Sequence, residues 1–259
     1  MIEIGKIVSN EVLQDSYYEL KLSLPQISEQ TEQGQFVHIK IPNLQDRILR
    51  RPFSICNVKD GILTIVYKVV GRGTEALSKA QPGTECDVLG PLGTAFTLPD
   101  DETIPVIVAG GYGSAATYIL AQRSKRKGYL LLGARTKDDL ILIDKFEKLG
   151  FKVLISTNDG SVGKKGFVTE LIPEVIEKEE GEKLRFYGCG PMPMLMAMGK
   201  VVTETNHPAE LSLDELMCCG IGACFACVVK VKADNSDGWR FARTCKEGPV
   251  FDANDVYYG

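Results

Sequence analysis

The chain has 259 residues, enough for two or three compact domains of ordinary size. Hydrophobic residues make up 44% and charged residues 25% of the chain, the composition of a soluble globular protein. A net charge of -4 gives no basic surface of the kind that binds nucleic acid, and no apolar run approaches the roughly 18 residues of a membrane helix. The N-terminal MIEIGKIVSN lacks a signal-peptide pattern, so we expect a cytoplasmic protein.

Residues 1–98 predict a small antiparallel β-barrel. Alternating apolar and polar residues predict strands over 17–25, 35–42 and 61–70. Asp60 begins a favourable Asp-Gly hairpin turn, and glycine and proline recur at short intervals throughout this region. Many short strands joined by tight turns are typical of such a barrel.

The next segment, residues 99–206, alternates between strand and helix patterns. The predicted strands cover 104–110, 129–134, 151–157 and 183–190, and the predicted helices cover 114–128, 138–150, 167–181 and 192–205. This alternation builds a parallel sheet with helices on both faces, in which ligands bind beyond the carboxyl ends of the strands. Residues 207–259 have little helical pattern and hold most of the cysteines, and we expect them to form a third, small domain.

The cysteine spacing is the sharpest signal in the chain. Five of the eight cysteines fall within residues 218–245. Cys219, Cys224 and Cys227 follow the pattern C-x4-C-x2-C, and Cys245 comes after seventeen further residues, which is the plant-type 2Fe–2S arrangement. Without an export signal a disulfide framework is disfavoured.

Two glycines and the remaining cysteines complete this segment. Gly220 and Gly222 let the backbone pass close to a cluster and direct N–H groups at sulfur, which tunes the reduction potential. Structural zinc, which usually shows paired C-x2–4-C units, stays open as an alternative. Cys218 is interpreted as a non-ligand beside a ligand. The other cysteines, Cys56, Cys86 and Cys189, are interpreted as small buried side chains or loop thiols.

Two short motifs in the first segment indicate a phosphate and an aromatic ring. Residues 51–54 (RPFS) lie between two predicted strands, and residues 71–74 (GRGT) form a loop after the second. Arginine pairs bidentately with phosphate, and a Gly-x-Gly-Thr loop offers backbone N–H groups to a pyrophosphate. The aromatic residue beside serine suits a stacked ring that needs a hydrogen-bond partner. Each motif alone is equally typical of a turn.

Together the motifs resemble the ferredoxin–NADP reductase superfamily, in which an FAD-binding barrel precedes a nicotinamide-binding α/β domain. The motifs are RPFS (51–54), YKVVGRGT (67–74), GPLG (90–93), the glycine-rich turn after 104–110 and CGP (189–191). The cysteine motif narrows the resemblance to the electron-transfer subunits of class 1B dihydroorotate dehydrogenases. Supporting segments are GQFVHI (34–39), LRRPFSI (49–55), DVLGPLG (87–93), CGIGACFACVV (219–229) and CKEGPVFD (245–252), so the resemblance covers essentially the whole chain.

The resemblance implies roles for the residues that match the family motifs. On the flavin side these are Arg51 at the FAD phosphates, Pro52 as a further residue of the cofactor site, Phe53 beside the flavin, Ser54 near its reactive nitrogen, Tyr67, Lys68 and Val69 along the ring and ribityl chain, and Gly73 and Thr74 at the pyrophosphate. On the nucleotide side they are Gly110, Gly111 and Gly113, followed by Asp159-Gly160-Ser161 and Cys189-Gly190-Pro191. Cys219, Cys224, Cys227 and Cys245 would hold the cluster.

Two features limit what the resemblance implies. Ala109, Ala115 and Ala116 replace glycine and proline residues that the family usually carries around the glycine-rich turn. The alternative that this turn serves only tight packing between strand and helix therefore stays open. Neither histidine fits a catalytic pattern, and His38, in a predicted strand, and His207, beside proline, are interpreted as structural.

The resemblance implies an oxidoreductase that moves electrons from the FMN of a partner catalytic subunit, through the 2Fe–2S cluster and FAD, to NAD+. The partner would oxidise dihydroorotate in pyrimidine biosynthesis, in a heterotetramer with two of each subunit. No acidic residue ends the second parallel strand, so NAD rather than NADP follows from the resemblance alone. Two alternatives stay open: an NAD(P)H-dependent flavin and iron–sulfur reductase subunit of another complex, and a non-catalytic zinc-stabilised binding module.

Overall fold

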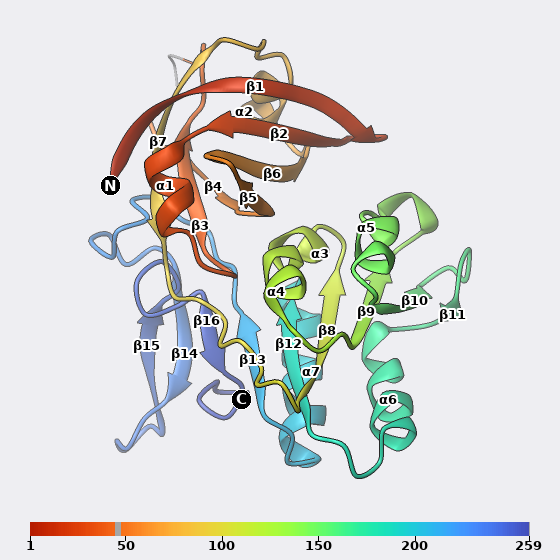
Figure 1. Cartoon of the computed structure of the whole chain (residues 1–259). Helices are drawn as coiled ribbons and strands as arrows, with labels where there is room; N and C mark the ends of the chain where they lie inside the picture. The colour runs from red at the N-terminus through yellow and green to blue at the C-terminus, as the bar shows by residue number, and fades with distance from the viewer. Residues whose placement is uncertain (45–47, 259) are drawn as a thin grey trace.

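The computed structural model describes residues 1–44 and 48–258, which form two seven-stranded sheets and a two-stranded ribbon (Figure 1). The ribbon consists of β14 (Val228–Lys232) and β15 (Trp239–Arg243), which pair antiparallel and lie beside the second sheet. This arrangement confirms the predicted fold class: a barrel-like antiparallel sheet, a parallel α/β sheet and a small C-terminal segment.

The first sheet is antiparallel, with strand order β4-β3-β7-β1-β2-β6-β5. Its strands are β1 (Ile2–Gln14), β2 (Tyr17–Ser23), β3 (Phe36–Lys40), β4 (Arg51–Ser54), β5 (Asn57–Lys59), β6 (Ile62–Lys68) and β7 (Glu85–Leu92), and its helices are α1 (Pro25–Gln30) and α2 (Arg72–Ser78). Just after β4, the Ile55 N–H donates to the Gln35 carbonyl (3.0 Å) and the Cys56 N–H donates to the Thr64 carbonyl (2.9 Å). The chain thus passes from pairing beside β3 to pairing with β6, which joins the two ends of the sheet into a barrel.

The second sheet is parallel except for its last strand, β16, which runs antiparallel to β13. In spatial order its strands are β11 (Lys164–Lys165), β10 (Lys152–Thr157), β9 (Tyr129–Ala134), β8 (Ile104–Gly110), β12 (Leu184–Cys189), β13 (Ala209–Ser212) and β16 (Val250–Asp252). The domain boundary predicted at residue 207 stays a prediction, but the sheet extends across it, because β13 and β16 both follow that residue.

Helices cover both faces of the second sheet. They are α3 (Gly113–Ala116), α4 (Tyr118–Arg123), α5 (Ile143–Lys148), α6 (Ile172–Lys178) and α7 (Met192–Glu204), with 3-10 turns η1 (Lys137–Asp139) and η2 (Val168–Leu171). On one face Ile107 and Leu130 pack with residues of α3, α4 and α5, whereas on the other Val108 and Leu131 pack with η2, α6 and α7. Because the residues of β8 and nearly all those of β9 are buried from one side or the other, these strands read as continuous apolar runs.

Three predicted helices are shorter than their patterns indicated, and the one predicted over 167–181 forms η2 followed by α6, which ends at Lys178. The predicted helix 114–128 is divided at Thr117, whose hydroxyl donates back to the Gly113 carbonyl (3.1 Å), a contact that bends helices, and α4 ends at Arg123. The predicted helix 138–150 forms only η1 and α5. Residues 140–142 between them are all buried, and three successive apolar residues do not share one stripe of a helix.

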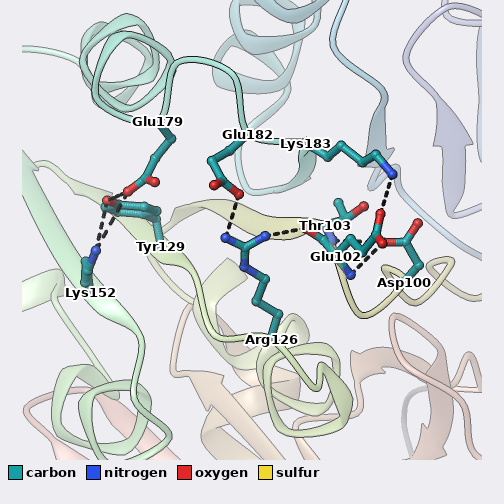
Figure 2. A network of polar contacts seen from close by, with 9 residues as sticks. All are labelled: Asp100, Glu102, Thr103, Arg126, Tyr129, Lys152, Glu179, Glu182 and Lys183. Atoms are coloured by element: carbon teal, nitrogen blue, oxygen red, sulfur yellow. Dashed lines mark hydrogen bonds and ion pairs between the residues drawn. The ribbon is translucent and has the colours of Figure 1, made fainter.

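A polar network holds the amino-terminal ends of the parallel strands, away from their carboxyl ends (Figure 2). Arg126 donates to the Glu102 carbonyl and to the Glu182 carboxylate, the latter at 2.7 Å. Lys183 pairs with the Glu102 carboxylate at 2.6 Å. These groups are mostly exposed, so each pair contributes little to stability and the network mainly fixes the loops between the strands. No helix within the described residues is long and apolar enough to cross a membrane.

One buried carboxylate fixes the connection between the two sheets. Glu210, in β13, is 8% exposed and accepts hydrogen bonds from the Thr97 N–H (2.9 Å) and the Thr97 hydroxyl (2.7 Å). Its carboxylate also pairs with Arg185 of β12 at 3.1 Å. Glu210 therefore anchors the segment that leaves the barrel to a central strand pair of the second sheet.

We expect Glu210→Ala to destabilise the chain by about 2–3 kcal/mol. Removing one partner of a fully buried ion pair costs roughly 3–5 kcal/mol, and the guanidinium of Arg185 is a quarter exposed, which reduces that cost. Urea unfolding followed by circular dichroism measures the difference. Glu204→Ala, at an exposed position in α7, is the control. Equal unfolding free energies for the two variants would contradict the anchoring role.

Candidate functional site

A cleft of about 210 Å3 lies where the barrel meets the carboxyl ends of the parallel strands. Eight of the predicted site residues line it: Pro52, Phe53, Ser54, Tyr67, Lys68 and Thr74 on the flavin side, and Cys189 and Gly190 on the nucleotide side. The opposite side consists of residues that follow β8, β12 and β13. A larger cavity, of about 510 Å3, lies at the opposite ends of these strands beside Arg185 and His207, and none of the predicted site residues lines it. The cleft is therefore the candidate site, because open α/β sheets bind ligands at their carboxyl edge.

The motif RPFS forms a strand, whereas the sequence pattern indicated a connection between strands. As β4 it pairs antiparallel with β3, so that Pro52 is opposite His38 and Ser54 is opposite Phe36. Cross-strand partners face the same side of a sheet, so these four side chains share one face. Phe53 is 8% exposed and packs edge-on against Tyr67, with ring centroids 5.8 Å apart.

Arg51 and Gly73 lie together beside the cleft. A β-carbon at Gly73 would be 3.3 Å from the Arg51 Nε, so the guanidinium lies directly against this glycine. The predicted open loop 71–74 is instead the start of α2, which is a correction to the sequence interpretation. Thr74 closes that turn, because its hydroxyl oxygen accepts the N–H groups of Val70 (2.9 Å) and Gly71 (3.2 Å).

Lys68 connects the barrel to the second sheet. Its ammonium pairs with the Asp139 carboxylate at 2.6 Å, and the Tyr17 hydroxyl donates to the same oxygen at 2.9 Å. The hydrogen bond from Lys68 holds the pKa of Asp139 below its usual range, and burial raises that of Tyr17. Val69 does not line the cleft; its N–H donates to the Ser16 carbonyl (2.9 Å). The charge of Lys68 therefore serves the contact between the sheets.

The glycine-rich turn after β8 packs tightly against the CGP motif. A β-carbon at Gly113 would be 2.0 Å from the Cys189 carbonyl oxygen, and one at Gly110 would be 2.7 Å from the Cδ of Pro191. Gly111 has a φ of +54°. The two loops thus require glycine for close packing, and Tyr112, Cys189 and Gly190 line the cleft, whereas Gly110, Gly111 and Gly113 do not. The turn 159–161 after β10 does not line it.

The four motif thiols come together as two contacting pairs. Cys219 contacts Cys224, and Cys245 contacts Cys227. Burial opposes ionisation of Cys219, but N–H groups of the loop, including those of Ile221 and Ala223, hydrogen-bond to its sulfur and lower the pKa to about 6. Burial and the neighbouring Cys227 raise the pKa of Cys245 to about 12.

Two thiol pairs suit a two-iron cluster. In such a cluster each iron takes two thiolates and shares two sulfides with the other, which matches two pairs better than one tetrahedral cage. Within the described residues, no three His, Cys, Asp or Glu side chains are grouped as ligands of a single metal ion. Gly220 and Gly222 have φ of +71° and +84°, and Arg243 braces the loop by donating to the Gly222 carbonyl at 2.7 Å. The residues present therefore fit the predicted cluster.

Two side chains belong both to the cluster segment and to the cleft. Phe36, 4% exposed, packs against Cys227 and Cys245, and Met217 packs against the same group. Both also line the cleft. The sequence analysis did not identify either residue. Phe36 lies in the GQFVHI segment, which indicated the family resemblance but did not indicate a position for Phe36 between the cysteines and the cleft. The cleft and the thiols are thus separated by single side chains.

His38 adjoins this junction on the same strand as Phe36. It is 0% exposed, and neither of its ring nitrogens has a hydrogen-bond partner in the part of the chain that the structure describes. Burial, followed by the charge of Arg50, lowers its pKa to about 4, so the imidazole is neutral near pH 7. The structural interpretation of His38 explains its burial, but not its unsatisfied nitrogens.

The fold and these sites define a reductase of the ferredoxin reductase type with an added iron–sulfur segment. A solved structure described as the NADH-dependent reduced ferredoxin-NADP oxidoreductase, studied for flavin-based electron bifurcation, is 29% identical over 99% of this chain and 90% of that one, with a TM-score of 0.84. The ferredoxin reductase of carbazole 1,9a-dioxygenase shares the fold, with a TM-score of 0.65 over 80% of this chain and 66% of that one at 20% identity.

Residues 214–257 match the model of the iron-sulfur cluster binding domain of dihydroorotate dehydrogenase B. The electron transfer subunit of dihydroorotate dehydrogenase B (NAD(+)) from Fusobacterium nucleatum subsp. nucleatum is 37% identical over 98% of each chain. The subunit of that name from Geobacillus kaustophilus is 39% identical over 96% of each. The chain belongs to this family of electron transfer subunits.

Proposed function

We propose that this chain carries electrons from the FMN of a dihydroorotate-oxidising catalytic subunit, through a 2Fe–2S cluster and FAD, to NAD+, in pyrimidine biosynthesis. The observation that supports the path most directly is the sharing of Phe36 and Met217 between the thiol pairs and the cleft. A flavin exchanges electrons singly or in pairs and a 2Fe–2S cluster exchanges one, so the chain converts between a one-electron donor and a hydride acceptor. Its residues supply placement and electrostatics, and the cofactors supply the redox chemistry.

On the flavin side, the proposed FAD site consists of the cleft face of the barrel. Arg51, against Gly73 at the start of α2, is positioned to meet the phosphates, because guanidinium groups pair bidentately with phosphate oxygens. Pro52, Phe53 and Ser54 with Tyr67 supply the surface for the ring. Tyr67 is 4% exposed and its hydroxyl donates to Asn10 (3.0 Å), so this wall is rigid.

On the nucleotide side, NAD+ would approach from the carboxyl ends of β8 and β12. The packed turn of Gly110, Gly111 and Gly113 brings Tyr112 and Cys189 to the cleft opposite the barrel. This arrangement supports a proposal in which the hydride acceptor and the flavin occupy two sides of one cavity. The choice of NAD over NADP is supported by the names of the family members.

The catalytic partner would dock at the cysteine segment. Three exposed apolar side chains lie there close to the cysteines in the chain, Leu216 (87% exposed), Ile221 (56%) and Phe225 (61%), and we call them the cluster-side surface. Cys224 itself is exposed, so a partner docked here brings its own redox group close to the thiols. We further propose an FMN-containing partner, a heterotetramer with two of each subunit, and a cytoplasmic location, which suits reduced thiolates.

The two alternative functions fare differently. The zinc-stabilised binding module is contradicted by the match of residues 214–257 to an iron-sulfur cluster binding domain. A reductase subunit of another complex is favoured by the similarity to the ferredoxin-NADP oxidoreductase structure, but the dihydroorotate dehydrogenase subunits are more similar in sequence. Purified chain assayed for NADH formation with a dihydroorotate-oxidising subunit, and with reduced ferredoxin instead, separates the two.

We expect Cys245→Ser to abolish the cluster while FAD stays bound. The variant leaves one thiol pair with a single thiolate, and serine is a poor ligand for iron compared with thiolate. Iron, acid-labile sulfide and flavin are measured in the purified chain. Cys218→Ser, beside Cys219 but assigned no ligand role, should keep full iron content. Unchanged iron in Cys245→Ser would overturn the ligand set.

Arg51→Ala should weaken FAD retention by about 10–100-fold, because a charge-assisted hydrogen bond to phosphate contributes about 1.5–3 kcal/mol. Equilibrium dialysis followed by flavin absorbance measures this. Lys79→Ala, which removes an exposed cation just after α2, should retain FAD as the wild type does. Equal retention in both variants would refute the Arg51 assignment.

Leu216→Asp should weaken binding of the catalytic subunit at least about tenfold, because a charge placed in an apolar interface is desolvated without a partner. Analytical ultracentrifugation or calorimetry with the purified subunit gives the affinity, and iron content verifies that the cluster is intact. Phe167→Asp changes a residue that is 67% exposed beside the second sheet and serves as the matched control. Equal affinities would place the docking surface elsewhere.

A further inference from the structure

His38 is a buried polar side chain without a partner in a molecule where its neighbours are well packed. Its exposure is 0%, and neither Nδ1 nor Nε2 has a hydrogen-bond partner among the described residues. Buried ring nitrogens in native proteins are almost always hydrogen-bonded, so an unpaired imidazole indicates a group that the polypeptide itself does not supply. Simple packing would be met by an apolar residue of the same size.

The residue that contacts the His38 ring indicates where the missing hydrogen-bond partner lies. A β-carbon at Gly220 would be 2.7 Å from the His38 Cε1, 2.8 Å from Nδ1 and 3.0 Å from Nε2. Because these three distances are nearly equal, Gly220 packs over the face of the imidazole at its Cε1, so the ring directly contacts the residue that follows Cys219. Gly220 has a φ of +71°, which favours glycine, and its missing side chain lets the cysteine loop approach the ring this closely.

His38 shares a face of the β3–β4 pair with residues of the cleft but does not itself line the cleft. His38 is opposite Pro52 in the β3–β4 pair, and its ring lies 5.7 Å from that of Phe36. Pro52 and Phe36 line the cleft, whereas His38 does not. The imidazole instead contacts the loop that holds Cys219, so the cluster site is the nearest source of a partner for its ring nitrogens.

We propose that His38 is a positioning residue for the iron–sulfur site, donating a hydrogen bond from its ring N–H to a sulfur on the Cys219 side of the cluster. The inference rests on the proposed ligand set. A hydrogen bond to a cluster sulfur stabilises the added electron and raises the reduction potential. The neutral ring does so without placing a positive charge in the junction between the two redox sites.

The first test uses the holo-chain labelled with 15N-histidine, in which the chain offers only two labels, His38 and His207. Pulsed electron paramagnetic resonance of the reduced cluster should detect 15N coupling, because a hydrogen bond to sulfur transfers spin density onto the donor nitrogen. His207→Gln, at the far end of the second sheet beside the larger cavity, should keep that coupling and His38→Gln should remove it. Absence of coupling in the wild type, with the cluster present, overturns the proposal.

The second test compares His38→Leu, which removes the donor, with His38→Gln, which restores an N–H donor from an amide. We expect His38→Leu to shift the reduced-to-oxidised ratio of the cluster about tenfold toward the oxidised form at the wild-type midpoint, which is 59 mV for one electron. His38→Gln should recover most of that shift. Equal potentials in wild type and His38→Leu, or equal shifts in both variants, overturn the proposal.

Cluster content separates the remaining outcomes. Loss of iron from His38→Leu with retention in His38→Gln supports a required donor. If both variants lose iron, the labelled wild-type chain decides the question. Coupling of the cluster to 15N in that chain supports the hydrogen bond, and absence of coupling overturns the proposal. A wild-type chain that binds flavin but no iron would overturn the proposed function, and this inference with it, whereas an intact cluster with an unmoved potential overturns the inference alone.

Discussion

The relative position of the cysteine segment and the cleft depends on the packing of Phe36. On one side its ring packs against Cys227 and Cys245, and on the other it lines the cleft. Phe36 lies on β3, which pairs with β4 on one side and with β7 on the other. The barrel thus fixes one ring between the two sites that must exchange electrons. Any rotation of the cysteine segment against the barrel would have to displace a residue that is 4% exposed.

Separate contacts hold the barrel against the second sheet. Lys68 and Tyr17 both reach Asp139, and Glu210 anchors the connecting segment. A third contact joins residues far apart in the chain, since the Thr94 N–H donates to the Gly248 carbonyl at 2.7 Å. Each contact contributes little stability alone, but together they fix the barrel and the second sheet on both sides of the cleft. The geometry of the cleft is therefore a property of the assembled chain and not of either sheet.

The sequence predicted the parallel strands well because their apolar runs are continuous, and the strands at 104–110 and 129–134 end at the predicted residues. It missed the strand character of residues 51–54, where proline and arginine mask the pattern, and the division of helix 114–128 at Thr117. The cysteine ligands were predictable from spacing, and the thiol pairs fit that prediction. The sequence could not predict the positions of Phe36 and Met217 or the unpaired ring nitrogens of His38. These features arise from contacts between β3 and a loop about 180 residues later in the chain.

The corner between Ile55 and Cys56 has a consequence for how the molecule meets others. Because the barrel closes there, the backbone groups at this corner pair within the barrel rather than with a neighbouring chain. The second sheet ends in β11 and β16, of two and three residues, which are too short to recruit a strand. Association through backbone pairing is therefore disfavoured at this corner and at both ends of the second sheet, so contacts made there depend on side chains, where recognition is selective.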